Sequence, residues 1–182
     1  RYGFEHLTGI DVAQVYVDAA RLFAETKGVA ADFRVAFGEA LPFPDKSFDA
    51  ILSRQGLQFL PDVLGTLGRL YVALKRGGRI AAAVWGSPDV VQFALVIPII
   101  LRELDLPVPP AGRPGPFALA DARMLEQLVA DVGFRDVETG TVTAVYETAS
   151  PQDCTQWIRD VAPPLANLTK AQPAAVKEGG WR

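Results

Sequence analysis

The stretch GEALPFPDKSFDAILSRQGLQFLPD, residues 38–62, places an apolar strand between a proline-rich turn and a loop that opens into a helix. Its central run, FDAILS at 48–53, is almost continuously apolar, which is typical of a parallel strand covered on both faces. A strand followed by a loop and a helix is one unit of an α/β sheet, and ligands bind such sheets beyond the carboxyl ends of the strands. We therefore predict a binding site just after this strand.

The flanking segments repeat the alternation of strand and helix. Residues 4–10 predict a strand, followed by apolar residues at helical spacing up to Gly28, and residues 32–37 predict the next strand. Asp62 is placed to cap a helix that ends at Gly77-Gly78, and 79–85 reads as another buried strand. The pattern predicts an α/β domain with a mostly parallel sheet and helices on both faces.

The regular alternation of predicted strands and helices is interrupted after residue 85. Residues 86–117 are interrupted by proline and glycine, and we interpret them as an insertion or substrate lid, although their apolar part would equally suit a core helix. Asp121 is the expected N-cap of a further helix, and 137–147 predicts an antiparallel hairpin at the sheet edge. We divide the chain into a domain at 1–150 and a C-terminal helix with an irregular tail at 151–182.

Composition excludes several classes of function. The chain of 182 residues has the size of one domain, and its net charge of -3 does not indicate a nucleic-acid partner. One histidine, His6, and one cysteine, Cys154, exclude a zinc cluster and an internal disulfide. The longest apolar run, 93–101, falls well short of the roughly 20 residues of a membrane helix, and we recognise no signal peptide. We expect a cytoplasmic protein without a membrane span.

Four motifs occur in an informative order: GID at 9–11, EALPFPDKSFD at 39–49, LQFLPD at 57–62 and LKRGGRI at 74–80. Together they resemble the class I S-adenosylmethionine-dependent methyltransferases, and most closely the branch of the ubiquinone and menaquinone C-methyltransferases. The resemblance implies a Rossmann-like fold and S-adenosylmethionine as cofactor, with S-adenosylhomocysteine as product. It also implies methyl transfer to a small apolar or aromatic acceptor.

The resemblance assigns the nucleoside half of the cofactor site. Asp11 would accept hydrogen bonds from the ribose hydroxyls, and Val12 would lie against adenine. Gly38, through its backbone N–H, and Glu39 would also contact the base, whereas Phe37 stands where the family pattern has an aspartate. The alternatives are purely structural roles: Asp11 would only cap the following helix, and Val12 would only pack in the core.

The remaining assignments follow the strand at 48–53. Ser53 and Gln55 would hold the methionine portion of the cofactor, and Gln58, Phe59 and Trp85 would border the acceptor. We predict no acid-base catalyst, because an in-line methyl transfer depends on close approach and alignment. The alternative for Gln55 and Gln58 is hydrogen bonding at the start of the helix.

The glycine-rich loop of the family, which follows its first strand, has no counterpart here. We therefore expect the first strand and helix of the family fold to be missing from a truncated chain, which leaves an unfilled central position in the sheet. A longer natural protein, a rearranged pairing, or a strand supplied in trans by a homodimer partner would each fill it. Two rival functions stay open: a scaffold or binding protein of this fold that no longer binds the cofactor, and a dinucleotide-binding dehydrogenase.

Overall fold

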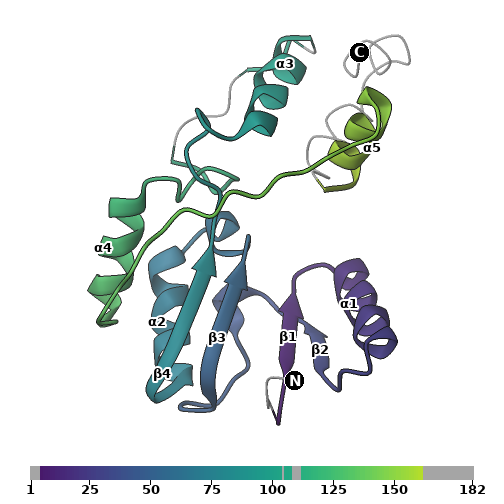
Figure 1. The fold of residues 1–182 in the computed structure, drawn as a ribbon. Coiled ribbons are helices and arrows are strands. Elements are labelled where there is room, and N and C mark those ends of the chain that lie inside the picture. Colours follow the sequence, from purple (N-terminus) through teal and green to yellow (C-terminus); the bar gives the residue numbers. More distant parts are fainter. Residues whose placement is uncertain (1–4, 104, 108–111, 162–182) are drawn as a thin grey trace.

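The computed structural model describes residues 5–103, 105–107 and 112–161, apart from the side chains of Glu39, Phe93, Arg159 and Val161. Two parallel strand-helix-strand units come first along the chain, and further helices follow them (Figure 1). The predicted α/β class with parallel strands is thus confirmed.

The first unit consists of β1 (Thr8–Asp11), α1 (Gln14–Thr26) and β2 (Asp32–Val35). The strands pair in parallel, with Thr8 opposite Asp32 and Asp11 opposite Val35. β1 begins later than the predicted 4–10 and reaches Asp11, because residues 8–11 are the ones that pair with β2. Gly28, just past α1, has a left-handed φ of 61°, as expected of a glycine that ends a helix.

The second unit consists of β3 (Phe48–Arg54), α2 (Val63–Ala73) and β4 (Leu74–Ala83). Asp62 caps α2 as predicted: its Oδ1 accepts from the Gly65 N–H at 2.8 Å. The helix ends at Ala73 rather than at Gly77-Gly78, since Leu74 already lies opposite Phe48 of β3. Strand pairing therefore overrides the glycine signal, and both glycines lie inside β4.

The four strands form two separate two-stranded sheets, β1–β2 and β3–β4. In Figure 1 the two pairs stand side by side, with β1 and β3 as the inner neighbours. Short 3₁₀ turns follow the strands in both units: η1 (Gly38–Ala40) after β2 and η2 (Leu57–Phe59) after β3. Four of the predicted site residues lie in these turns: Gly38, Glu39, Gln58 and Phe59.

The main core is built around the second unit and includes residues that follow it in the chain. Leu57, Leu67, Leu70 and Leu119 form its buried centre. α4 (Ala122–Val132) packs against α2 and adds partly buried apolar residues to this cluster: Leu125, Leu128, Val129 and Val132.

Both ends of α4 match the sequence prediction. The Asp121 side chain accepts from the Arg123 N–H at 2.9 Å and caps the start of the helix. Gly133 ends it with a left-handed φ of 111°. Phe134 then stacks edge-on against Tyr71 of α2, with ring centroids 5.0 Å apart, and this contact ties α4 to the second unit.

The segment 137–147, predicted as an antiparallel hairpin, contains no strand. It runs as an extended connection from α4 towards α5 (Pro151–Val161), with Val142 91% exposed (Figure 1). The hairpin prediction was wrong because β-branched residues favour strands only where a partner strand or an apolar face receives them. The tail at 162–182 lies outside the described residues.

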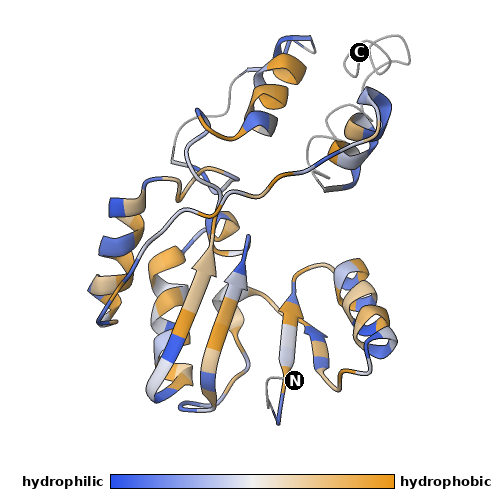
Figure 2. Ribbon diagram, viewed as in Figure 1, coloured by the Kyte–Doolittle hydropathy of each residue, from blue (hydrophilic) through white to orange (hydrophobic). Residues whose placement is uncertain are grey.

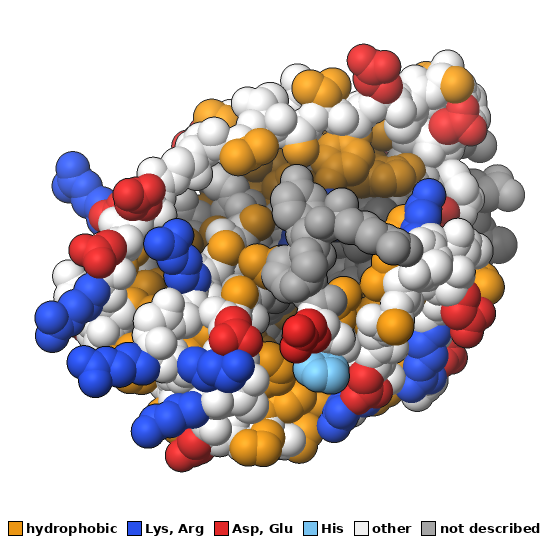
Figure 3. Space-filling view, turned by 60° about the horizontal axis from the view of Figure 1, so that its bottom comes forward, with side chains coloured by type: hydrophobic (Ala, Val, Ile, Leu, Met, Phe, Trp, Pro, Cys, Tyr) orange, Lys and Arg blue, Asp and Glu red, His pale blue; other side chains and the backbone are white. Residues whose placement is uncertain are grey.

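The segment 86–117, predicted as an insertion or lid, contains η3 (Gln92–Leu95) and α3 (Val96–Glu103). Figure 2 shows α3 as largely apolar, and its Ile100 and Leu101 are buried. Within the described ranges, no helix combines the length and the apolar character that a bilayer crossing requires. On the face shown in Figure 3, apolar side chains reach the surface between charged ones.

Candidate functional site

Asp11 lies at the carboxyl end of β1, where the sequence places the ribose contact. Its Oδ1 accepts from the Ala13 N–H at 2.8 Å, immediately before α1 begins at Gln14. Ala13, the N-cap of α1, makes no side-chain cap of its own, so this bond helps to begin the helix. Asp11 therefore has the helix-start role that the sequence offered as the alternative, and a carboxylate can still accept further hydrogen bonds through its remaining lone pairs.

The ends of β1 and β2 meet next to this carboxylate. The Ala36 N–H donates to the Asp11 carbonyl oxygen at 3.1 Å, which holds the residue that follows β2 beside Asp11. Val12 and Phe37 are 57% and 59% exposed, so neither is packed in the core. The packing alternative for Val12 therefore finds no support in this arrangement.

Gly38 opens η1 at a point of close approach. A Cβ atom added there would lie 2.7 Å from Cδ2 of Leu60, so a larger residue would require the Leu60 side chain to move. The side chain of Glu39, the other predicted adenine contact, lies outside what the structure describes. The turn that follows β2 thus lies against Leu60 in the loop that follows β3.

At the carboxyl end of β3, Ser53 lies opposite Ala82 of β4. Two residues later Gln55 adopts a left-handed φ of 57°, a conformation that costs a non-glycine residue about 1–2 kcal/mol. Its backbone N–H donates to the Ala83 carbonyl oxygen at 2.8 Å, so the strained residue is fixed to β4.

Gln58 lies in η2 and is fully buried. Its Nε2 donates to Oε1 of Gln55 at 2.6 Å, and its backbone oxygen accepts from the Gly115 N–H at 2.9 Å. Among the residues that the structure describes, Oε1 of Gln58 has no hydrogen-bond partner, which costs about 1–3 kcal/mol for a buried polar atom. The structure thus joins Gln55 and Gln58, and the bond to Gly115 brings the 86–117 segment onto η2.

The aromatic residues predicted to border the acceptor differ in exposure. Phe59 is 48% exposed, and Trp85 is partly buried beyond the end of β4. Phe59 is adjacent to Gln58 in η2, whereas Trp85 follows the neighbouring strand. Both therefore lie at the end of the β3–β4 pair that carries Ser53 and Gln55.

Sequence reasoning missed two features of this region. The Gln55–Gln58 hydrogen bond and the positive φ of Gln55 depend on the loop path, although the three-residue spacing of the two glutamines is a weak signal. Thr66 was also missed: it is 2% exposed in α2, and its hydroxyl oxygen has no hydrogen-bond partner within the described part of the chain. Buried threonines within a helical pattern resemble ordinary core positions, so no sequence signal marks this one.

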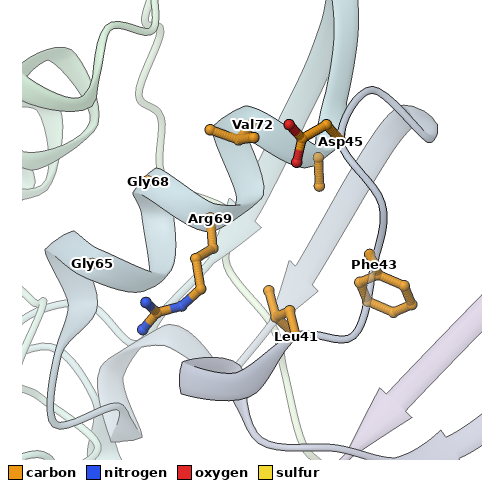
Figure 4. A pocket seen from close by; sticks show the side chains of 8 residues that line it. Leu41, Phe43, Asp45, Gly65, Gly68, Arg69 and Val72 are labelled. Carbon is orange, nitrogen blue, oxygen red and sulfur yellow. The ribbon is translucent and has the colours of Figure 1, made fainter.

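A pocket of about 330 Å³ lies elsewhere, between the turn at 41–45 and α2 (Figure 4). None of the predicted site residues lines it. Its wall is formed by Leu41, Phe43, Asp45, Gly65, Gly68, Arg69, Val72 and Ala73. The described residues also contain no group of three or more histidine, cysteine, aspartate or glutamate side chains arranged to hold a metal ion.

The N-terminal part of the chain is similar in sequence to known methyltransferases. Residues 1–82 match the methyltransferase domain family. A ubiquinone biosynthesis O-methyltransferase from Paramagnetospirillum magneticum is 44% identical over 78 residues, which cover 43% of this chain and 30% of that protein. A demethylmenaquinone methyltransferase from Thermus thermophilus is 34% identical over 98 residues, 54% of this chain and 44% of that protein. The chain thus spans less than half the length of either relative.

Solved structures agree on the fold. The YcgJ protein of a Bacillus species superposes with a TM-score of 0.56 at 18% identity and covers 96% of this chain and 72% of its own. The methyltransferase CalH, solved with S-adenosylhomocysteine, gives a TM-score of 0.54 at 18% identity and covers 74% of this chain and 38% of its own. S-adenosylmethionine is the cofactor of this family. Residues 1–82 thus match the methyltransferase domain family, and the chain is similar there to ubiquinone and demethylmenaquinone methyltransferases.

Proposed function

We propose that the protein containing this chain transfers a methyl group from S-adenosylmethionine to a small apolar or aromatic acceptor. The observation that carries the proposal is the position of Asp11 at the carboxyl end of β1, beside the end of β2, within residues that match the methyltransferase domain. Relatives named as a ubiquinone biosynthesis O-methyltransferase and a demethylmenaquinone methyltransferase support an acceptor of this kind.

The residues present fit the cofactor by the chemistry of their donor and acceptor groups. In this proposal Asp11 accepts from the ribose hydroxyls with the lone pairs that the Ala13 N–H leaves available. The exposed Val12 lies against adenine, and Gly38 and Glu39 contact its edge. The close approach of Gly38 to Leu60 keeps the backbone of the turn near the loop after β3.

In this proposal the carboxyl end of the β3–β4 pair binds the methionine portion of the cofactor and the methyl acceptor. Ser53 and Gln55 hold the methionine portion, and Gln58, Phe59 and Trp85 form the acceptor side. When bound, S-adenosylmethionine supplies an electrophilic methyl group for in-line displacement. The protein side chains orient the two molecules and exclude water, which suits a site built from neutral polar and aromatic groups.

The domain limits belong to the same proposal. We place the methyltransferase-like domain at 1–150, with 86–117 as the element that covers the acceptor. The hydrogen bond from the Gly115 N–H to the Gln58 carbonyl oxygen supports this role, because it fixes the segment against η2. Limited proteolysis with and without S-adenosylhomocysteine tests it: the cofactor product should protect bonds within 86–117 from cleavage.

A homodimer follows from this arrangement if a second copy supplies a strand between β1 and β3, which are not paired with each other among the described residues. Light scattering at micromolar concentration tests this idea. A monomer with intact secondary structure would exclude it.

Calorimetric titration with S-adenosylhomocysteine tests the function itself. Asp11→Ala should weaken binding about 10- to 100-fold, because a carboxylate that accepts from two hydroxyls loses charge-assisted hydrogen bonds. Asp49→Ala is the matched control: this carboxylate is 84% exposed, pairs with Lys75 and lies at the opposite end of β3. A folded wild-type chain that does not bind would favour the cofactor-free scaffold, and equal losses in both variants would contradict the assignment of Asp11.

A further inference from the structure

Gln55 occupies an unusual position at the end of β3. A non-glycine residue with a φ of 57° is strained, and the hydrogen bond from its backbone N–H to the Ala83 carbonyl oxygen holds it in that conformation. Strain of this kind persists only where the surrounding structure enforces it, and it gathers at functional sites. The sharp turn sends the side chain of Gln55 back towards η2, where it meets Gln58.

Gln58 is held in place by its burial and by its backbone contacts. The side chain is fully buried, its neighbour Leu57 belongs to the main core, and its backbone oxygen is bonded to the Gly115 N–H. A core position normally favours an apolar residue, since a buried amide with an unpartnered oxygen lowers stability. The Gln58 amide therefore lowers the stability of the fold, and the hydrogen bond that its side chain does make is to Gln55.

The direction of that bond decides which half of the Gln55 amide is left for a ligand. Gln58 donates from Nε2, so Oε1 of Gln55 is engaged as an acceptor at 2.6 Å. That bond uses one of the two lone pairs of Oε1, whereas the Gln55 NH₂ keeps both of its hydrogens and can only donate. A donor at the carboxyl end of β3 is suited to a carboxylate or carbonyl oxygen and unsuited to an ammonium group.

We propose that Gln58 is a positioning residue, whose amide fixes Gln55 so that its NH₂ group is directed to a carboxylate of the bound ligand. This inference rests on the proposed function, in which that carboxylate belongs to the methionine portion of the cofactor. Gln58 then acts on this carboxylate through Gln55.

A double-mutant cycle read by S-adenosylhomocysteine affinity tests the proposal. Gln55→Ala should weaken binding about tenfold, as expected for the loss of a hydrogen bond to a charged group. Gln58→Met, similar in size but without a donor, should weaken it about three- to tenfold. The double variant should be no weaker than Gln55→Ala alone, because the two residues act as one unit. Losses that multiply would overturn the proposal, as would unchanged affinity in Gln58→Met.

Gln127→Met is the matched control. Its Nε2 donates to Oδ1 of Asp131 on the exposed face of α4, so the same chemical change is made outside the site. It should leave affinity unchanged. If Gln58→Met does not fold, Gln58→Asn replaces it in the cycle: it keeps the amide but is one methylene too short to reach Gln55.

A second readout does not require cofactor binding. In the ligand-free protein, NMR relaxation of the Gln55 side-chain NH₂ should show a restrained group in wild type and in Gln127→Met, and a freely moving group in Gln58→Met. A Gln55 amide that is equally mobile in all three would overturn the positioning role. Failure of wild type to bind S-adenosylhomocysteine, with a restrained Gln55 amide, would instead reject the proposed function and its carboxylate and leave Gln58 as the residue that orients Gln55.

Discussion

The two strand-helix-strand units have the same element order and the same parallel pairing, but they bury their helices to different degrees. In α2, Leu67 is fully buried and Leu70 is 9% exposed. In α1, Leu22 and Phe23 are 63% and 64% exposed. α4 packs over α2, whereas the main contacts of α1 are with β1 and β2 of its own unit. α1 buries Val17 and Ala24 while its Leu22 and Phe23 stay exposed, whereas α2 also buries leucines in the cluster that α4 joins.

The largest test of this comparison is Leu67→Ala set against Leu22→Ala, the same substitution within the two helices. Leu67→Ala should lower the free energy of unfolding by about 3 kcal/mol, because it leaves a cavity in a packed cluster. Leu22→Ala should change it by less than about 0.5 kcal/mol, as usual for an exposed position. Urea denaturation monitored by circular dichroism measures both. Similar losses for the two variants would mean that α1 is covered in solution.

A smaller effect is expected at the junction that ties α4 to the second unit. Gly133→Ala should destabilise the protein by about 1–2 kcal/mol, because a left-handed φ of 111° is unfavourable for a residue with a Cβ atom. The added methyl group would lie 3.5 Å from the ring of Tyr71, an ordinary van der Waals distance, so the backbone conformation accounts for the loss. Gly140→Ala is the control, since nothing lies within 4 Å of its Cβ position. Equal melting temperatures for the two variants would argue that the α4 layer contributes little to stability.

The smallest test concerns two glycines within α2. Gly68→Ala should stabilise the protein by about 1 kcal/mol through helix propensity, because the space around it is open. Gly65→Ala should lose that gain or reverse it, since its Cβ would lie 2.0 Å from Oδ2 of Asp62 and displace the capping carboxylate. Thermal unfolding of both variants measures the difference. A Gly65→Ala variant as stable as Gly68→Ala would show that the cap of Asp62 is dispensable.

The sequence was most reliable where a feature depends on neighbouring residues. Asp62 and Asp121 cap their helices as predicted, and Gly133 ends α4, because each of these signals acts within one helical turn. The motif order around 38–85 also predicted the family that the comparison of residues 1–82 supports. The placement of Asp11, Ser53 and Gln55 at strand ends followed from the strand pattern alone.

Tertiary structure decided the features that depend on distant partners. The segment 137–147 has the residues of a hairpin and forms none, because strand residues need a sheet edge to receive them. α1 and α2 carry similar apolar patterns, yet only α2 lies under α4. The bond between Gln58 and Gln55 depends on the left-handed turn that β4 stabilises through Ala83. Local signals set the elements and their ends, while burial, sheet pairing and side-chain orientation depend on contacts between residues far apart in the sequence.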